Sequence, residues 1–247
     1  MNILVTGATG FIGKNLVGSL VKKNHKVICL IRKTSKKADI DYLKKIKVQL
    51  FYGDITKKEN LSDSFNNIDV IYHLAGILGD FNTSKEDYYK THVQGTKNLL
   101  KFCKNQKFIY CSSAGVLGPV INGDELRKVN PTNVYEKTKA EAEKLVLEYN
   151  NYAILRPEFV YGSYDLHVLN LFRAIKNRNF YIIGDGSNML HPTYVDDLIF
   201  CLIKCLDKKI KNEIFMVAGE KPVSVEEFIK LVSSQLNVKT NKIKIPL

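Results

Sequence analysis

The sequence has 247 residues, which fits one large domain or one domain with a small lobe, since domains have roughly 100–200 residues. Hydrophobic residues make up 45% and charged residues 25%, so the composition excludes a disordered chain, a collagen-like repeat and a coiled coil. The formal net charge is +12, but only five of the basic residues are Arg, the residue that phosphate and base recognition favour. We therefore interpret most Lys residues as solvated, and the absence of a helix-turn-helix or RNA-binding motif argues against nucleic acid.

Targeting and metal signals are also missing. The longest strongly apolar run, at 198–206, contains Lys204 and is shorter than the roughly 18 residues of a membrane span, so no membrane partner is expected. The first residues carry no secretion signal, and we expect a cytoplasmic protein. The cysteines match no zinc or redox spacing, which predicts free buried thiols and no metal site; they are Cys29, Cys103, Cys111, Cys201 and Cys205.

Strand-like and helix-like patterns alternate along the first third of the chain, and further strands and helices follow. Short apolar runs predict strands at 2–5, 27–31, 48–52, 70–74, 108–111 and 153–160. Apolar positions at helical spacing predict helices at 12–23, 87–105 and 132–149. This alternation is typical of βαβ units, so we expect an α/β fold with a Rossmann-type, doubly wound parallel sheet.

A glycine-rich turn lies between the first predicted strand and the first predicted helix. It reads Thr6-Gly7-Ala8-Thr9-Gly10-Phe11-Ile12-Gly13. Glycines here permit a tight turn, a close approach to a pyrophosphate and close helix–strand packing, while the helix N-terminus favours an anion. We predict a dinucleotide site that includes Gly7, Thr9, Gly10, Phe11, Ile12 and Gly13.

The end of the second predicted strand bears on the choice of cofactor. NAD-binding folds usually place an acidic residue there for the adenosine ribose, whereas this chain has Ile31-Arg32-Lys33. Arg32 can pair with a 2′-phosphate, so NADP(H) is favoured over NAD(H). The other interpretation is a solvated strand end in a Lys-rich protein.

The alternation of strand-like and helix-like segments becomes less regular after residue 161, where glycine-rich turns such as Gly184-Asp185-Gly186 appear. We predict a dinucleotide-binding domain at 1–161 and a small substrate-binding lobe at 162–247. Within the lobe, 213–218 is predicted to return to the main sheet as a strand, and Ser224 to cap a helix. The chain stops within a strand-like run at 242–247, so the short lobe fits either a compact substrate site or a truncated sequence.

Three polar residues form a candidate catalytic group. Tyr135 and Lys139 are four residues apart on a predicted helix and share one face. An ammonium group near a tyrosine, helped by an oxidised nicotinamide, favours the phenolate over the neutral side chain, whose ordinary pKa is about 10. Ser113 follows a predicted strand, where its hydroxyl can bind a substrate oxygen. Each signal alone is weak, because surface helices and turns produce such residues often.

In this order along the chain, these motifs resemble the extended short-chain dehydrogenase/reductase family, in its NAD(P)-dependent sugar epimerase/dehydratase branch. The resemblance runs from Met1 to Leu247 and includes three further motifs: Gly53-Asp54-Ile55, His73-Leu74-Ala75-Gly76, and Arg156-Pro157-Glu158-Phe159-Val160-Tyr161-Gly162. In the lobe it adds Gly184-Asp185-Gly186-Ser187-Asn188 and Tyr194-Val195-Asp196-Asp197.

The resemblance implies a role for each matched residue. Tyr135 is the general acid/base, Lys139 lowers its pKa and holds the nicotinamide ribose, and Ser113 binds the reacting oxygen. Asp54 and Ile55 flank the adenine; Leu74, Ala75 and Gly76 line the cofactor; Pro157 and Val160 lie near the nicotinamide. His73 is expected to pack at a strand end. The resemblance also implies a homodimer that uses the helix of Tyr135.

The sequence departs from the family at three places. His92 stands where relatives usually have Asn before Val-x-Gly-Thr, and it either supports the same local hydrogen bonds or alters the proton path to Lys139. Ala114-Gly115 follow Ser113 where dehydratases have an Asp-Glu pair, which disfavours dehydration. Met189-Leu190-His191-Pro192-Thr193 lacks the Arg that often binds a substrate pyrophosphate, and relatives usually continue further.

Three functions fit these observations. The first is a nucleotide-sugar epimerase, similar to UDP-glucose 4-epimerase, that oxidises a hydroxyl to a ketone and reduces it again. The second is an NADPH-dependent reductase of a sugar or small carbonyl compound, favoured by Arg32 and by the missing pyrophosphate Arg. The third is a dinucleotide-binding sensor or scaffold without turnover, against which Ser113, Tyr135 and Lys139 argue.

Overall fold

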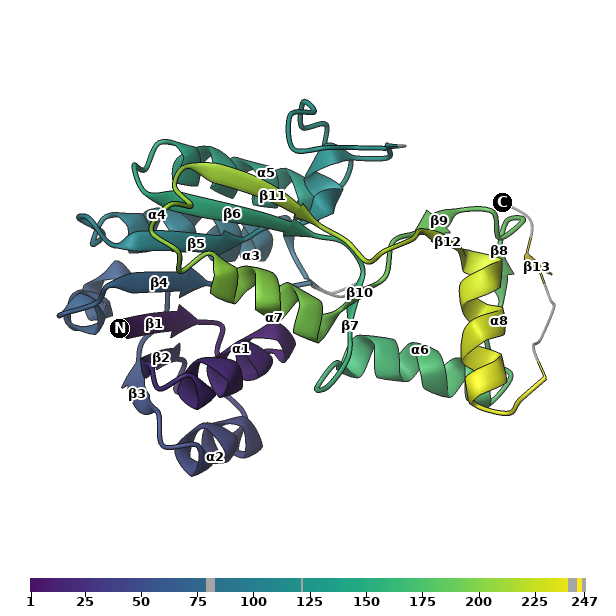
Figure 1. Cartoon of the computed structure of the whole chain (residues 1–247), viewed down its shortest axis with the longest axis horizontal. Coiled ribbons are helices and arrows are strands. Elements are labelled where there is room, and N and C mark those ends of the chain that lie inside the picture. Colours follow the sequence, from purple (N-terminus) through teal and green to yellow (C-terminus); the bar gives the residue numbers. More distant parts are fainter. Residues whose placement is uncertain (79–82, 121, 240–243, 246–247) are drawn as a thin grey trace.

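The chain folds around a seven-stranded parallel sheet with helices on both faces (Figure 1). The computed structural model describes residues 1–78, 83–120, 122–239 and 244–245. Across the sheet the strands are β11 (Glu213–Val217), β6 (Tyr152–Pro157), β5 (Lys107–Cys111), β4 (Val70–His73), β1 (Asn2–Thr6), β2 (Lys26–Ile31) and β3 (Gln49–Tyr52). Every neighbouring pair is parallel, which confirms the predicted doubly wound α/β fold.

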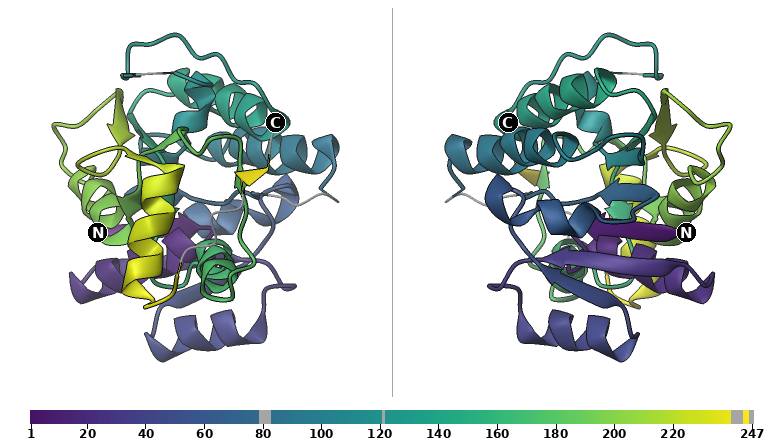
Figure 2. Two further views of the ribbon diagram at one scale, coloured as in Figure 1. Left: turned by 90° about the vertical axis from the view of Figure 1, so that its right-hand side faces the viewer. Right: turned by 90° about the vertical axis from the view of Figure 1, so that its left-hand side faces the viewer.

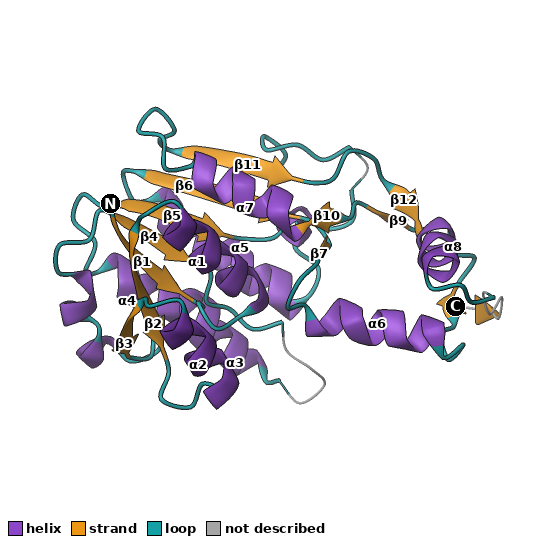
Figure 3. Ribbon diagram, turned by 60° about the horizontal axis from the view of Figure 1, so that its bottom comes forward, coloured by secondary structure: helices purple, strands orange, loops and turns teal. Residues whose placement is uncertain are grey.

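The alternation of side chains along the strands builds one hydrophobic core on each face of the sheet. Ile3 and Val5 of β1 belong to one core and Leu4 belongs to the other. The first core is covered by α1 (Phe11–Lys22), α2 (Lys37–Lys45) and α7 (Val195–Lys204). The second is covered by α4 (Gly95–Leu100) and α5 (Val134–Leu147), as Figure 3 shows from a tilted view.

The remaining elements are short or lie beyond the strand ends. A single helical segment runs through α3 (Lys85–Tyr88), the π-helix η3 (Tyr89–Gln94) and α4; the 3₁₀ helices are η1 (Lys58–Asn60), η2 (Ser62–Phe65) and η4 (Ala114–Leu117). Past the carboxyl ends of the sheet lie α6 (Leu166–Lys176) and α8 (Val225–Gln235) (Figures 1 and 2). Near them are three two-stranded pairs: β7 (Val160–Tyr161) with β10 (Thr193–Tyr194), β9 (Met189–Leu190) with β12 (Val223–Ser224), and β8 (Ile182–Ile183) with β13 (Lys244–Ile245).

Several sequence predictions need correction. The helix predicted at 87–105 begins at Lys85, because Ser84 caps it by accepting the Asp87 N–H, and it ends at Leu100. The strand predicted at 153–160 is two strands, since the chain turns at Phe159, whose φ is 28°. Helices α2 and α6 were not predicted. Cys103 and Cys201 are only half-buried, unlike the other three thiols.

The Ser224 cap is confirmed, because its Oγ accepts the Glu227 N–H at 3.1 Å. Of the strand-like run at 242–247, only Lys244–Ile245 lies within the described residues. The division of the chain at residues 161 and 162 stays a prediction. None of the helices in the described part of the chain has the length and hydrophobicity needed to cross a membrane.

Candidate active site

The strand order reverses between β1 and β4, and this switch point is where doubly wound sheets bind ligands. Gly7 follows β1, and Leu74 and Ala75 follow β4. The φ of Gly7 is +70°, and a Cβ there would lie 2.7 Å from the backbone atoms of both Leu74 and Ala75. Only glycine allows the two turns to touch, as the sequence motif predicts.

The beginning of α1 fits a pyrophosphate. Gly10 is the N-cap and offers no side-chain acceptor, and the first turn contains no acidic residue. A Cβ on Gly13 would lie 2.1 Å from the Gly7 carbonyl oxygen, so helix and turn pack closer than any other residue permits. The first N–H groups of α1 and the positive end of its dipole therefore favour an anion at this edge of the sheet.

The residues predicted to hold the adenosine half lie at the same edge, after β2 and β3. Arg32 follows β2 and is exposed. Asp39 on α2 is the nearest acidic residue along the chain and forms an ion pair with Lys14. The Asp54 carboxylate accepts the N–H and the hydroxyl of Thr56, each at 2.9 Å. Ile55 is buried and packs against Gly95, where a Cβ would lie 2.6 Å from its Cδ1.

A capping box fixes the start of the helix that carries Tyr135. Asn133 Oδ1 accepts the Glu136 N–H at 2.9 Å, and Glu136 Oε2 accepts the Asn133 N–H at 3.3 Å. Tyr135 therefore lies in the first turn of α5, with Lys139 one turn later on the same face. The predicted placement of this pair on one helix agrees with the structure.

Ser113 and Lys139 both connect α5 to the end of β5. The Ser113 side chain faces Tyr135 and lowers the pKa of its phenol, and it accepts the Gly115 N–H at 3.2 Å. Lys139 Nζ donates to the Cys111 carbonyl oxygen at 2.6 Å and lies 4.4 Å from the centre of the Tyr110 ring. The structure thus brings together the three residues that the sequence marks as catalytic candidates.

Burial sets the protonation states of this group in the protein alone. It raises the pKa of Tyr135 to about 12, while the neighbouring Ser113 side chain acts in the opposite direction. It lowers the pKa of Lys139 to about 8, opposed by nearby Cys111 and Glu143. At neutral pH Tyr135 holds its proton and Lys139 is mostly charged. Forming the phenolate therefore requires a further positive charge close to Tyr135.

A buried ion pair, not noticed in the sequence, anchors α5 to β6. Arg156 donates to both carboxylate oxygens of Glu143, at 3.1 and 2.7 Å, and both side chains are almost fully buried. Removing one partner of such a pair typically costs about 3–5 kcal/mol, because the other charge is left unpaired. The pair holds α5 beside Pro157, the residue predicted to lie near the nicotinamide.

The two histidines named in the sequence analysis have different surroundings. His73 is fully buried, with its ring nitrogens 2.8 Å from Thr6 Oγ1 and 2.9 Å from Thr96 Oγ1, which suits a packing role. His92 is buried against Tyr135, with ring centroids 5.5 Å apart and an interplanar angle of 82°. In the sequence, the only indication of a role for His92 is that it replaces the Asn of the family pattern.

The segment without the pyrophosphate Arg lies in the C-terminal part, where β9 pairs with β12. Thr193 connects this segment to the end of β6: its N–H donates to the Phe159 carbonyl at 3.1 Å, and its hydroxyl to the Glu158 carbonyl at 2.6 Å. The turn at Phe159 is thereby fixed between the candidate nicotinamide residues Pro157 and Val160.

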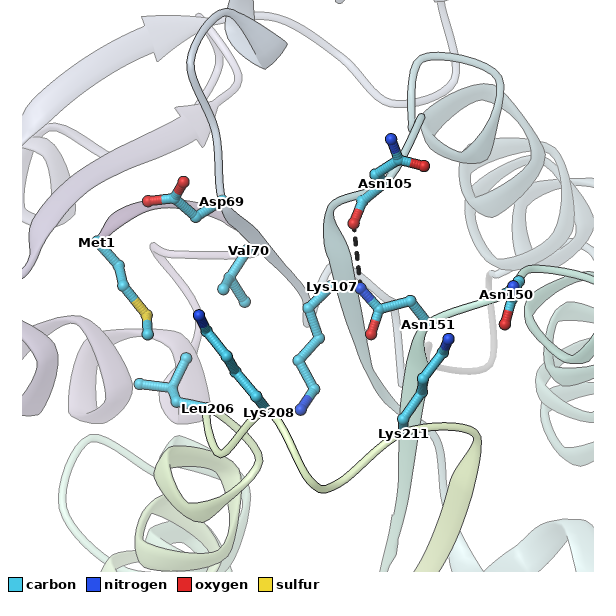
Figure 4. A pocket seen from close by; sticks show the side chains of 10 residues that line it. All are labelled: Met1, Asp69, Val70, Asn105, Lys107, Asn150, Asn151, Leu206, Lys208 and Lys211. Atoms are coloured by element: carbon cyan, nitrogen blue, oxygen red, sulfur yellow. Dashed lines mark hydrogen bonds between the residues drawn. The ribbon is translucent and has the colours of Figure 1, made fainter.

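A separate cavity of about 620 Å³ lies at the opposite, amino edge of the sheet (Figure 4). It is lined by Met1, Asp69, Val70, Asn105, Lys107, Asn150, Asn151, Leu206, Lys208 and Lys211. None of the residues predicted to bind cofactor or substrate contributes to it. Within the described residues, no group of three or more His, Cys, Asp or Glu side chains is placed to hold a metal ion.

Comparison with known proteins identifies the family. The model of the 3-beta hydroxysteroid dehydrogenase/isomerase family matches residues 4–247, and the chain belongs to this family. It is an NAD(P)-dependent enzyme of the extended short-chain dehydrogenase/reductase type, which confirms the resemblance seen in the sequence.

The relatives span several reactions. A 4-hydroxy-2-methyl-3-oxo-4-farnesyl-3,4-dihydroquinoline-1-oxide ketoreductase of Stigmatella aurantiaca is 26% identical over 100% of this chain and 76% of its own length. A decarboxylating sterol-4-alpha-carboxylate 3-dehydrogenase of Candida albicans is 30% identical over 90% of this chain and 71% of its own. The structure of a UDP-glucuronic acid 4-epimerase of Bacillus cereus, in complex with NAD, superposes with a TM-score of 0.88 at 29% identity, covering 100% of this chain and 87% of that one.

Proposed function

We propose that the chain is an NAD(P)-dependent epimerase of a nucleotide sugar, working through a transient ketone. The observation that carries the proposal is the placement of Ser113 against Tyr135, with Lys139 on the same helix and the glycine turn at the same edge of the sheet. The similarity to the Bacillus cereus epimerase supports the choice of substrate.

In this proposal the chain's residues move one proton and hold one oxygen. A nicotinamide held at the glycine turn would supply the hydride acceptor and donor. The Tyr135 phenolate removes the proton of the sugar hydroxyl as that carbon is oxidised, and the Tyr135 phenol gives a proton back when the hydride returns to the other face of the ketone. Ser113 donates a hydrogen bond to the reacting oxygen. The Lys139 ammonium favours the phenolate and would help to hold the nicotinamide ribose.

Two observations favour a second function, an NADPH-dependent carbonyl reductase. Arg32 is exposed at the end of β2 with no acidic residue next to it in the sequence, and the segment Met189-Leu190-His191-Pro192-Thr193 contains no Arg. The similarity to the Stigmatella aurantiaca ketoreductase supports it. The same three residues would act in one direction only, with Tyr135 donating the proton to the carbonyl oxygen.

One set of assays separates these functions. The protein is incubated with NAD⁺ or NADP⁺ and either UDP-glucose or UDP-glucuronic acid, and the sugar is analysed for inversion at C4. NADPH oxidation is followed in parallel with a panel of aldehydes and ketones. Inversion supports the epimerase, and NADPH oxidation without inversion replaces it with the reductase. Dinucleotide binding with neither reaction would contradict both and favour a sensor.

We further propose that NADP(H) is preferred over NAD(H), supported by Arg32 and by the ion pair that occupies Asp39. A ligand at a hundred times its dissociation constant adds about 2.7 kcal/mol to the free energy of unfolding, which a thermal melt resolves. NADP⁺ is expected to stabilise the protein more than NAD⁺, and Arg32→Ser to remove the difference. Equal stabilisation of the wild type would contradict the preference. The homodimer implied by the resemblance is tested by sedimentation.

A further inference from the structure

His92 connects two parts of the active site that are far apart in the sequence. Its Nε2 accepts the backbone N–H of Ile77 at 3.1 Å, in the segment that follows β4. Its Nδ1 lies 2.8 Å from the hydroxyl oxygen of Thr138, on α5 between Tyr135 and Lys139. Both contacts are buried or half-buried, so water competes little for them.

The partners of the ring define its tautomer. A backbone N–H only donates, so Nε2 is unprotonated and the proton of a neutral ring is on Nδ1. The Thr138 hydroxyl lies 3.0 Å from the carbonyl oxygens of Val134 and Tyr135, to which it donates its own proton. It therefore accepts from Nδ1–H. A continuous chain runs from the Ile77 N–H through the imidazole and the Thr138 hydroxyl to the first turn of α5.

We propose that His92, as the neutral Nδ1–H tautomer, is a positioning residue that locks the cofactor-lining segment after β4 to the catalytic helix and fixes the ring of Tyr135.

The geometry excludes the alternative in which His92 relays protons to Lys139. The Lys139 ammonium donates to the Cys111 carbonyl oxygen, and the Nδ1 of His92 is directed to Thr138. Protonating Nε2 would place one N–H against the N–H of Ile77. Burial and the nearby Lys139 charge lower the pKa of His92 to about 3. The other titratable groups that face it are Tyr88 from α3, Tyr135 from α5 and His73 from β4.

Neighbouring residues leave room for this ring and hold its partner segment. A Cβ on Gly76 would lie 3.3 Å from His92 Nε2, so a side chain there would crowd the bond to Ile77. Tyr88, one turn before His92, donates its hydroxyl proton to the Leu78 carbonyl at 2.6 Å. Two side chains of the same helical segment thus hold Ile77 and Leu78. The Tyr88 and His92 rings both meet the Tyr135 ring edge to face.

The first test needs no substrate. Nitrogen-15 NMR of the imidazole rings, with the His92 signals assigned by their loss in His92→Asn, reports which nitrogen is protonated. We expect protonated Nδ1 and unprotonated Nε2 with no titration between about pH 5 and pH 8, whereas an ordinary histidine titrates near about pH 6.5. Protonated Nε2, or titration in this range, would overturn the proposal.

The second test rests on the proposed function and uses a double-mutant cycle in kcat, with NADPH and the best substrate of the assays above. His92→Leu and Thr138→Val each break the same link and are expected to lower kcat by about 10–100-fold, because small misplacements of catalytic groups are costly. The double variant is expected to be no slower than the slower single variant.

Three further measurements make the kinetic test specific. His92→Asn, which keeps one acceptor and one donor, is expected to recover most of the activity lost in His92→Leu. The dissociation constant for NADP⁺ is expected to change far less than kcat in Thr138→Val. His25→Asn, a histidine at the amino edge, serves as the control. Losses that multiply in the double variant, or no recovery with Asn, would contradict the positioning role. Failure of every assay with wild type would count against the proposed function alone, since the NMR result stands apart.

Discussion

The two edges of the same sheet carry opposite ends of its helices, and their side chains differ accordingly. At the carboxyl edge α1 begins after its N-cap Gly10 and α5 begins after the Asn133 cap, so the positive ends of two helix dipoles lie at the candidate active site. Helices α4, α5 and α7 end at the amino edge. The segments that follow them contribute three Lys and three Asn side chains to the lining of the cavity (Figure 4); the lysines are Lys107, Lys208 and Lys211.

Helix polarity explains this difference. Helix C-termini carry partial negative charge, and nearby cations are stabilising there by about 0.3–1 kcal/mol each. Lys107 fits this role, since its Nζ donates to the carbonyl oxygen of Asp207, just beyond the end of α7, at 2.6 Å. Lys107 at the amino edge therefore stabilises the fold, whereas the candidate active site lies at the carboxyl edge.

The largest expected effect is that of Tyr135→Phe. Removing a general acid/base typically lowers kcat by about 10²–10⁴-fold, whereas NADP⁺ binding is expected to stay nearly intact. Steady-state kinetics and a titration with NADP⁺ measure the two effects. Tyr149→Phe, just beyond the other end of α5, is the matched control and should leave kcat unchanged, although it loses a hydrogen bond to the Gln106 carbonyl. Loss of NADP⁺ binding in Tyr135→Phe would mean that this side chain is structural.

The second largest effect is expected for Gly13→Ala, which should lower both the unfolding free energy and the affinity for NADP⁺. The added methyl would lie 2.1 Å from the Gly7 carbonyl oxygen, so the turn must move, at a cost of about 1–3 kcal/mol in unfolding free energy. The dissociation constant for NADP⁺ should rise with it. In the control Gly18→Ala, on the same helix, the methyl meets only the Tyr42 hydroxyl at 3.2 Å, and stability should hold or increase. Similar melting temperatures and NADP⁺ affinities for both variants would refute the close packing of turn and helix.

Acid should destabilise the carboxyl edge through His92. Its pKa is about 3 in the folded protein, below the ordinary value of 6.5, so the unfolded chain binds the extra proton first. The unfolding free energy therefore falls as the pH drops below 6.5, by at most about 1.4 kcal/mol per pH unit for this group. Urea unfolding at several pH values should show a smaller slope in His92→Asn than in wild type. An unchanged slope would show that His92 does not contribute.

The smallest effects are expected at the amino edge. Lys208→Gln and Lys211→Gln should leave kcat and NADP⁺ binding unchanged and should alter the unfolding free energy by less than about 1 kcal/mol. Enzyme assays and urea unfolding of each variant check this. A clear change in activity would contradict this expectation, because it would connect the cavity to the active site.

The sequence predicted the parts of this molecule that depend on local patterns. The seven strands of the sheet are short apolar runs, and the glycine turn and the Tyr135–Lys139 pair follow from fixed spacings. Helix α2 was missed because it is rich in Lys and buries only Leu43. The hydrogen bonds of His92 reach residues 15 and 46 positions away, so no local pattern could reveal them. The Glu143–Arg156 pair was missed for the same reason.

The π-helix η3 (Tyr89–Gln94) has a consequence for insertions and deletions. A π-turn holds more residues than an α-turn, so it acts as an inserted position within the segment from Lys85 to Leu100. Deleting one residue near Lys90 would let the segment close into a regular α-helix, rotating the residues before the deletion relative to those after it. Tyr88 and His92 could then no longer both face Tyr135 while Gly95 and Asn98 kept their contacts with Ile55. The length of this segment is therefore constrained as tightly as the identity of its residues.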